Sequence, residues 1–174
     1  MLGRRPDFML LKSRDLAYLG VLLGLNQLFI ILSSIIETNT IILMAAAALI
    51  VGVAVVEFGG KAGIIFYLAS CISGFFLTFN KAELITYICF FGIYSIIKHY
   101  IETKINNKYI SYALKIGSFN LSLLLMYFFV KLFISLPLRW WMILGGQILF
   151  IIYDYSFTMF ITQYINSIRP KLKR

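Results

Sequence analysis

One acidic residue inside an apolar run is the feature of this sequence best suited to chemistry. Asp154 lies within the stretch IIYDYSF, among aliphatic and aromatic side chains. Gln147, Thr158 and Thr162 are spaced so that they share one helical face with it. A charged side chain at the centre of a bilayer costs at least about 2.5–3.5 kcal/mol, so it usually has a function or a partner. We therefore treat this polar face as a candidate ligand-binding site.

Asp154 has two interpretations that depend on polar residues elsewhere in the chain. Asn26 and Asn120 lie near the middle of other apolar runs, at a depth similar to that of Asp154. The three could line a cavity in which Asp154 anchors a cationic or hydrogen-bonding ligand or carries a proton. Alternatively, Asp154 is an interhelical clamp that pairs with Lys115 or hydrogen-bonds to both asparagines. With two outer-loop residues added, the predicted ligand-binding set is Asp154, Asn26, Asn120, Gln147, Thr158, Asn80 and Arg139.

The composition indicates that these residues lie on helices embedded in a membrane. The chain of 174 residues is 61% hydrophobic and 13% charged, with a mean hydropathy of +0.90. Soluble domains contain roughly 25% charged residues. A soluble fold of this size could not bury so much apolar surface, so the sequence predicts a single all-α integral membrane domain.

Six apolar runs stand between charged or turn-forming residues, and they predict a six-helix bundle. A helix needs about 20 residues to cross a bilayer. The second and fourth runs are shorter, but they could still cross if Lys98 snorkels or the bilayer thins locally. A five-span alternative makes the fourth run re-entrant. The predicted spans are 16–36, 41–56, 62–79, 84–97, 110–130 and 140–165.

The basic residues predict the orientation of the bundle in the cell membrane. The formal net charge is +9, and thirteen of the sixteen lysines and arginines fall on the side that holds both termini of a six-span chain. The other side holds only Lys81, Lys131 and Arg139. Because positive charge concentrates in cytoplasmic loops, both termini are predicted to be cytoplasmic. The same distribution identifies the lipid bilayer, and not a nucleic acid, as the partner of these charges.

The first run carries a stripe of small residues, Ala17, Gly20 and Gly24, along one side. Such spacing lets a second helix approach closely. The stripe therefore belongs either to ordinary packing inside the bundle or to a surface that docks on another membrane protein.

The size, the six short spans, the cytoplasmic termini and the small-residue stripe resemble the substrate-binding S components of energy-coupling factor transporters. That resemblance covers the whole chain and implies that the stripe docks on a membrane coupling subunit with partner ATPases. In the family an Ala-xxx-Ala surface does so, and Gly20 and Gly24 match its spacing with glycine in place of alanine. The resemblance also implies a micronutrient site in the outer half, under loops that correspond here to ETNT, FNKAE and KLFISLPLR.

These features predict a membrane subunit that captures a vitamin-like small molecule and takes its energy from partner ATPases. The alternative is a structural scaffold of cell-envelope assembly, since the rod-shape-determining membrane proteins of bacterial cell-wall synthesis have a similar size and span number. No HExxH, GxSxG or P-loop pattern is present in the sequence. We therefore expect no enzymatic activity, no cofactor and no metal.

Overall fold

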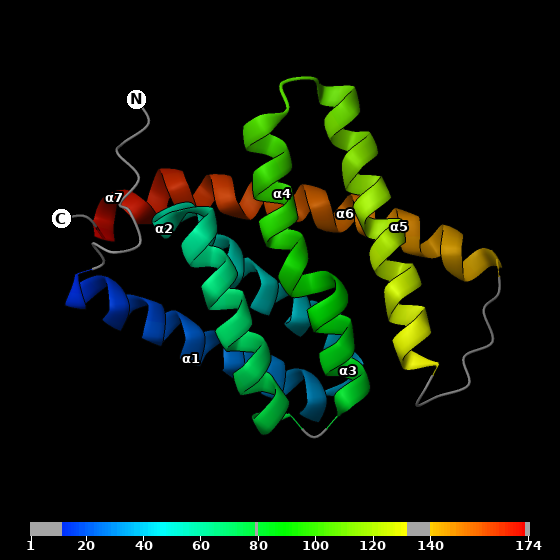
Figure 1. Ribbon diagram of the computed structural model, residues 1–174, viewed down its shortest axis with the longest axis horizontal. Helices are drawn as coiled ribbons and strands as arrows, with labels where there is room; N and C mark the ends of the chain where they lie inside the picture. The colour runs from blue at the N-terminus through cyan, green and yellow to red at the C-terminus, as the bar shows by residue number, and fades with distance from the viewer. Residues whose placement is uncertain (1–11, 79, 132–139, 173–174) are drawn as a thin grey trace.

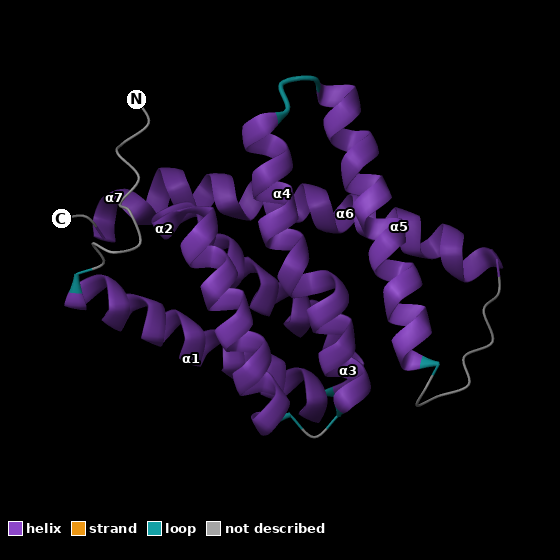
Figure 2. Ribbon diagram, viewed as in Figure 1, coloured by secondary structure: helices purple, strands orange, loops and turns teal. Residues whose placement is uncertain are grey.

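The computed structural model describes residues 12–78, 80–131 and 140–172, which are helical apart from short connections and contain no strand (Figure 2). Five helical segments in this part are long and apolar enough to cross a membrane. The all-α prediction is therefore confirmed. The helices are α1 (Ser13–Ile35), η2 (Glu37–Asn39), α2 (Thr40–Leu77), α3 (Lys81–Thr86), η3 (Tyr87–Gly92), α4 (Ile93–Lys104), α5 (Lys108–Val130), α6 (Trp140–Gln163), η4 (Tyr164–Ile168) and α7 (Arg169–Leu172).

The second and third predicted spans are joined in α2, without a loop between them. The chain bends at Gly59, whose φ of 85° and ψ of 169° lie in a region that only glycine adopts readily. Ala47 and Ser70 would be about 35 Å apart on a straight helix. Both nevertheless accept hydrogen bonds from neighbouring side chains of α1. The bend therefore folds α2 back on itself, with residues 40–58 and 60–77 as its two halves (Figure 1).

The fourth predicted span is longer than its apolar run. α3, the π-helical turn η3 and α4 form one continuous helical segment, Lys81–Lys104, of 24 residues. At 1.5 Å per residue this segment is about 36 Å long, which is enough to cross a bilayer without local thinning. The predicted end of this helix, near residue 97, comes too early in the chain, because the prediction treated Lys98 as the boundary of the span. Lys98 is instead buried within the helix.

α6 is held against the rest of the bundle mainly by aromatic side chains. It crosses α4 and α5 in Figure 1, and the rings of Phe119 and Phe150 stack with centroids 4.4 Å apart. Gly52 permits the close approach of α6 to α2, because a Cβ atom at this position would lie 2.7 Å from the Phe157 ring. The remaining rings of this cluster are Phe90, Phe91, Tyr94 and Tyr153.

The outward faces of α5 and α6 are apolar. Only 17% of the most apolar window in each of these segments is buried, against 50% in α2 and in Lys81–Lys104. Leu124, Phe128, Ile148 and Ile151 are each more than half exposed. Such surface is unfavourable in water and suits contact with lipid.

Candidate functional site

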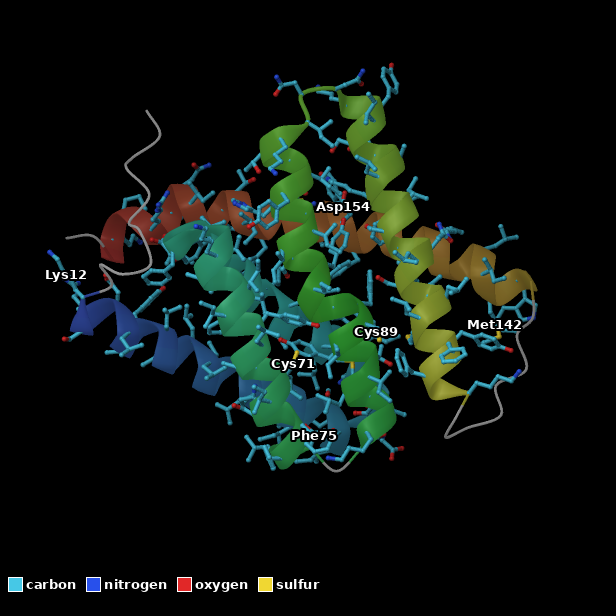
Figure 3. All side chains as sticks on the ribbon, viewed as in Figure 1. Lys12, Cys71, Phe75, Cys89, Met142 and Asp154 are labelled. Carbon is cyan, nitrogen blue, oxygen red and sulfur yellow. The ribbon has the colours of Figure 1, made fainter. Side chains whose placement is uncertain are left out.

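Asp154 lies where α4 passes over α6 (Figure 3). Its carboxylate is buried and accepts hydrogen bonds from three side chains of two other helices. The Tyr94 hydroxyl donates to Oδ1 at 2.6 Å, and the Lys98 ammonium also contacts Oδ1. Lys115 of α5 approaches Oδ2 at 3.3 Å. Asp154 therefore joins α4, α5 and α6 at one point.

Glu102 completes this arrangement from the last turn of α4. Its Oε1 atom lies 2.6 Å from Lys115 Nζ and 3.2 Å from Lys98 Nζ. One carboxylate oxygen thus bridges both lysines. Thr158 accepts a hydrogen bond from Lys98 at 2.8 Å and donates one to the Asp154 carbonyl at 2.9 Å. We call Lys98, Glu102, Lys115 and Asp154 the charge cluster.

The charge cluster balances two cations with two anions in a largely water-free environment. The side chains of Lys98 and Lys115 are only 4% and 7% exposed, and that of Asp154 is 11% exposed. Removing one member of such a cluster leaves an uncompensated buried charge, which is strongly destabilising. Glu102 differs from the other three because its side chain is 41% exposed. It therefore retains the most contact with water of the four side chains, and it is the member of the cluster that can most readily turn out into solvent.

The predicted contact between Asp154 and Lys115 is present, but sequence reasoning missed the other half of the cluster. Tyr94, Lys98 and Glu102 recur every four residues, so they share one face of α4. That spacing could have predicted that Lys98 and Glu102 lie on the same side of the helix as Tyr94. It was overlooked because Lys98 was placed at the membrane boundary, where lysines ordinarily reach water.

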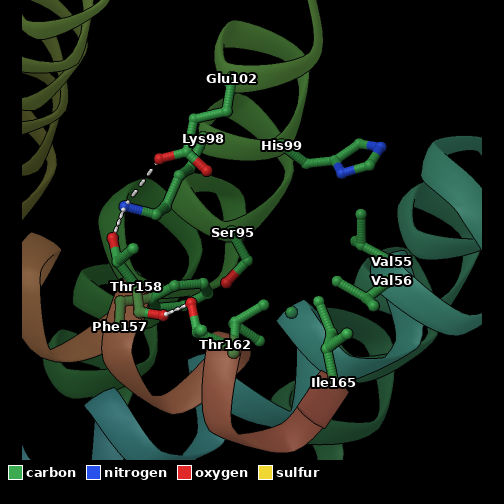
Figure 4. Close-up of a pocket in the computed structure, with 12 residues that line it drawn as sticks. Val55, Val56, Ser95, Lys98, His99, Glu102, Phe157, Thr158, Thr162 and Ile165 are labelled. Carbon is green, nitrogen blue, oxygen red and sulfur yellow. Dashed lines mark hydrogen bonds and ion pairs between the residues drawn. The ribbon is translucent and has the colours of Figure 1, made fainter. Parts of the chain in front are cut away.

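Two pockets adjoin the charge cluster, and Glu102 lines both of them. The first, of about 220 Å³, lies between α2, α4 and α6 and includes Lys98 and Thr158 (Figure 4). The second, of about 270 Å³, lies beside the turn between α4 and α5 and includes Lys115. The remaining lining of the first pocket is mostly apolar and consists of Gly52, Val55, Val56, Ser95, His99, Phe157, Ile161, Thr162 and Ile165.

Asn26 belongs to a separate and fully buried hydrogen-bond network. Its amide nitrogen donates to the Ala47 carbonyl at 2.8 Å and to the Tyr87 hydroxyl at 3.1 Å. Its amide oxygen accepts from Gln27 at 3.2 Å and from Ser70 at 2.5 Å. These four bonds use the full capacity of the amide. The network joins α1, both halves of α2 and η3, so Asn26 acts here as a structural clamp.

The other predicted ligand-binding residues are dispersed. Gln147 donates to Asn120 at 2.8 Å, and this pair links α5 to α6 away from the charge cluster. Asn80 caps the N-terminus of α3 by accepting from the Glu83 amide. Arg139 lies outside the described residues. Among the described members of the predicted set, only Thr158 contacts Asp154. The interpretation in which Asn26, Asn120 and Asp154 line one cavity is wrong, because the two amides pair within other helix contacts.

The small-residue stripe of α1 faces away from the bundle. Ala17, Gly20 and Gly24 are exposed, and a Cβ atom at either glycine would meet nothing within 4 Å among the residues that the structure describes. Packing inside the bundle therefore does not explain the two glycines.

The contacts of the charge cluster indicate what it can do chemically. It presents two ammonium groups and two carboxylates beside one mostly apolar pocket and one mostly polar pocket, which suits the binding of a small molecule with a polar or charged group. The described residues contain no group of three or more His, Cys, Asp and Glu side chains that could hold a metal ion.

The fold defines an all-helical chain with several helices of membrane-spanning length and a buried charge cluster. Comparisons with protein-family models, curated proteins and solved structures found no match. The assignment of a function therefore depends on the geometry of the chain itself.

Proposed function

We propose that this protein is a multi-pass subunit of the cell membrane that captures a small molecule for uptake, with energy supplied by partner ATPases through a coupling membrane protein. The observation that carries the proposal is the charge cluster beside two pockets, inside helices of membrane-spanning length. Ionisable residues at such positions generally mark ion or substrate pathways. The protein performs no catalytic step of its own, and its proposed arrangement is that of the S components of energy-coupling factor transporters.

A structural scaffold of cell-envelope assembly is the second candidate. One observation favours it: the charges of the cluster balance each other, so the cluster joins three helices without a ligand. A scaffold needs such a clamp and has no use for the adjoining pockets. Capture explains both the clamp and the pockets, and it is therefore the preferred function.

We propose six membrane spans, with both termini cytoplasmic. The bend at Gly59 supports this count, since the two halves of α2 would cross the membrane in opposite directions. The distribution of lysine and arginine supports the orientation. In this arrangement the second pocket, which adjoins the α4–α5 turn, lies toward the cytoplasmic side of the membrane, whereas the resemblance to S components implies a site in the outer half.

A topology measurement tests this orientation. In a protein whose Cys71 and Cys89 have been replaced by alanine, an impermeant thiol reagent added to intact cells should label Asn39→Cys and Asn80→Cys. It should leave Lys61→Cys and Asn106→Cys unlabelled until the membrane is opened. All four positions are exposed, so burial does not prevent labelling. Labelling of Asn106→Cys in intact cells would contradict the proposed orientation.

The α1 stripe is the proposed docking surface for the coupling subunit. A Cβ atom at Gly20 or Gly24 would meet nothing within 4 Å in the described chain, so leucine at either position should leave the melting temperature of the isolated protein almost unchanged. It should nevertheless prevent the close approach of a partner helix. The matched control is Gly52→Leu, which collides with Phe157 and should lower the melting temperature markedly.

Purification of a tagged protein from its native membrane tests the function itself. Capture predicts that ATPase subunits and a stoichiometric small molecule co-purify, the latter detected by mass spectrometry. Gly20→Leu should lose the ATPases and keep the small molecule. Recovery of cell-envelope proteins with neither ATPases nor a small molecule would favour the scaffold.

A further inference from the structure

We propose that Glu102 occupies an anion-binding site between Lys98 and Lys115, and that the captured molecule carries an anionic oxygen group that displaces the Glu102 carboxylate. This inference rests on the capture function proposed above and names the chemical class of its ligand. Lys98, Lys115 and Asp154 together carry one net positive charge, so they require a further anion in an environment where an unpaired charge is costly.

Glu102 supplies that anion in this structure, but it is held differently from Asp154. Asp154 is fixed by Tyr94 in addition to the two lysines, and its side chain is 11% exposed. Glu102 reaches the lysines from the end of α4 with a side chain that is 41% exposed. It can rotate into water without breaking the contacts of Asp154 with the two lysines. Displacement of Glu102 thus opens a site with two ammonium donors already in place.

The two pockets supply the space for the rest of the ligand. Glu102 lines both of them, so its departure frees space beside Lys98 in the first pocket and beside Lys115 in the second. The wall of the first pocket is apolar around Val55, Phe157 and Ile161. An anionic group on a short apolar body therefore fits this site, with the anion replacing Glu102 and the body lying against the apolar wall.

The Glu102 carboxylate competes with an added carboxylate for Lys98 and Lys115, and a measurement of this competition tests the proposal. The apparent affinity of a ligand falls in proportion to the fraction of molecules whose site is open. In nanodiscs of zwitterionic lipid at fixed chloride concentration, hexanoate should bind Glu102→Ala at least about tenfold more tightly than the wild type. Isothermal titration measures this affinity, and hexanoate should also raise the melting temperature of the variant. Glu102→Gln should behave in the same way, and it serves if the alanine variant does not fold.

Two controls separate an anion site from nonspecific apolar binding. Hexanamide has a similar shape to hexanoate but carries no charge. It should bind neither Glu102→Ala nor Glu102→Gln measurably. Glu102→Ala combined with Lys115→Met should lose the tighter binding of hexanoate, because one of the two donors is absent. Equal responses to hexanoate and hexanamide would overturn the inference. So would the absence of any response of the wild type and both Glu102 variants to either hexanoate or phosphatidylglycerol.

The same experiments distinguish a soluble anion from the phosphate of a lipid as the ligand of this site. Stabilisation of Glu102→Ala by phosphatidylglycerol in the nanodisc, with no response to hexanoate, would assign the site to a lipid phosphate and not to a soluble molecule. The inference and the proposed function can also fail separately. Hexanoate binding without any co-purified ATPase would keep the anion site and remove the uptake function. A neutral or cationic molecule that co-purifies and depends on Asp154 would keep capture and remove the anion site.

Discussion

Asp154→Asn should lower the free energy of unfolding by about 3–5 kcal/mol, which is the usual cost of breaking a buried ion pair by removing one partner. Asparagine keeps the size of the side chain and its hydrogen-bonding ability but removes one negative charge. Lys98 and Lys115 then face each other with only Glu102 to balance them. A melting curve in detergent, with unfolding followed by circular dichroism, measures the loss.

A second substitution identifies the cause of this loss. Adding Lys98→Met to Asp154→Asn leaves Lys115 and Glu102 as a neutral pair, and it should restore much of the stability. Glu37→Gln is the matched control, because Glu37 is an exposed acidic residue away from the cluster and its change should stay within about 0.5 kcal/mol. Unchanged stability of Asp154→Asn would show that the cluster does not act as a clamp.

Gly59→Ala should destabilise the protein by about 1–3 kcal/mol through the backbone alone. The residue has a φ of 85°, which alanine adopts only with strain. A Cβ atom here would meet nothing within 4 Å in the described part of the chain, so the expected loss does not depend on a steric clash. Loss of this bend would separate the two halves of α2 and with them the hydrogen bonds of Asn26 to Ala47 and Ser70.

Gly20→Ala is the control for this experiment, because its Cβ atom is equally uncrowded but its backbone is helical. Alanine in a helix is favoured over glycine by about 0.8–1.0 kcal/mol, so this variant should be as stable as the wild type or more stable. If the two variants melted at the same temperature, the strain attributed to Gly59 would be absent.

The amino-acid sequence is sufficient to predict an all-helical chain of membrane-spanning segments and to single out Asp154 as a buried acidic residue. Apolar composition and the length of the runs are local properties, and they are sufficient to predict helices of membrane-spanning length. The contact of Asp154 with Lys115 was also predictable, because a buried carboxylate needs a partner and few basic residues lie deep in the apolar runs. The positions of Glu57, Gly59 and Gly60 in EFGGK marked the end of a span, although they do not show that the chain bends there without a loop.

Which polar residues contact one another depends on how the helices pack. Asn26, Asn120 and Asp154 have similar depths, yet depth does not fix the direction in which each helix turns its side chains. Asn26 faces the two halves of α2, and Asn120 faces Gln147. Lys98 enters the cluster because α4 continues beyond its apolar run and crosses α6 close to Asp154. The cluster depends on the crossing of α4, α5 and α6, which is set by the packing of rings such as Phe119 on Phe150 and by the space at Gly52. These are contacts between residues far apart in the chain, and the periodicity of a single helix carries no information about them.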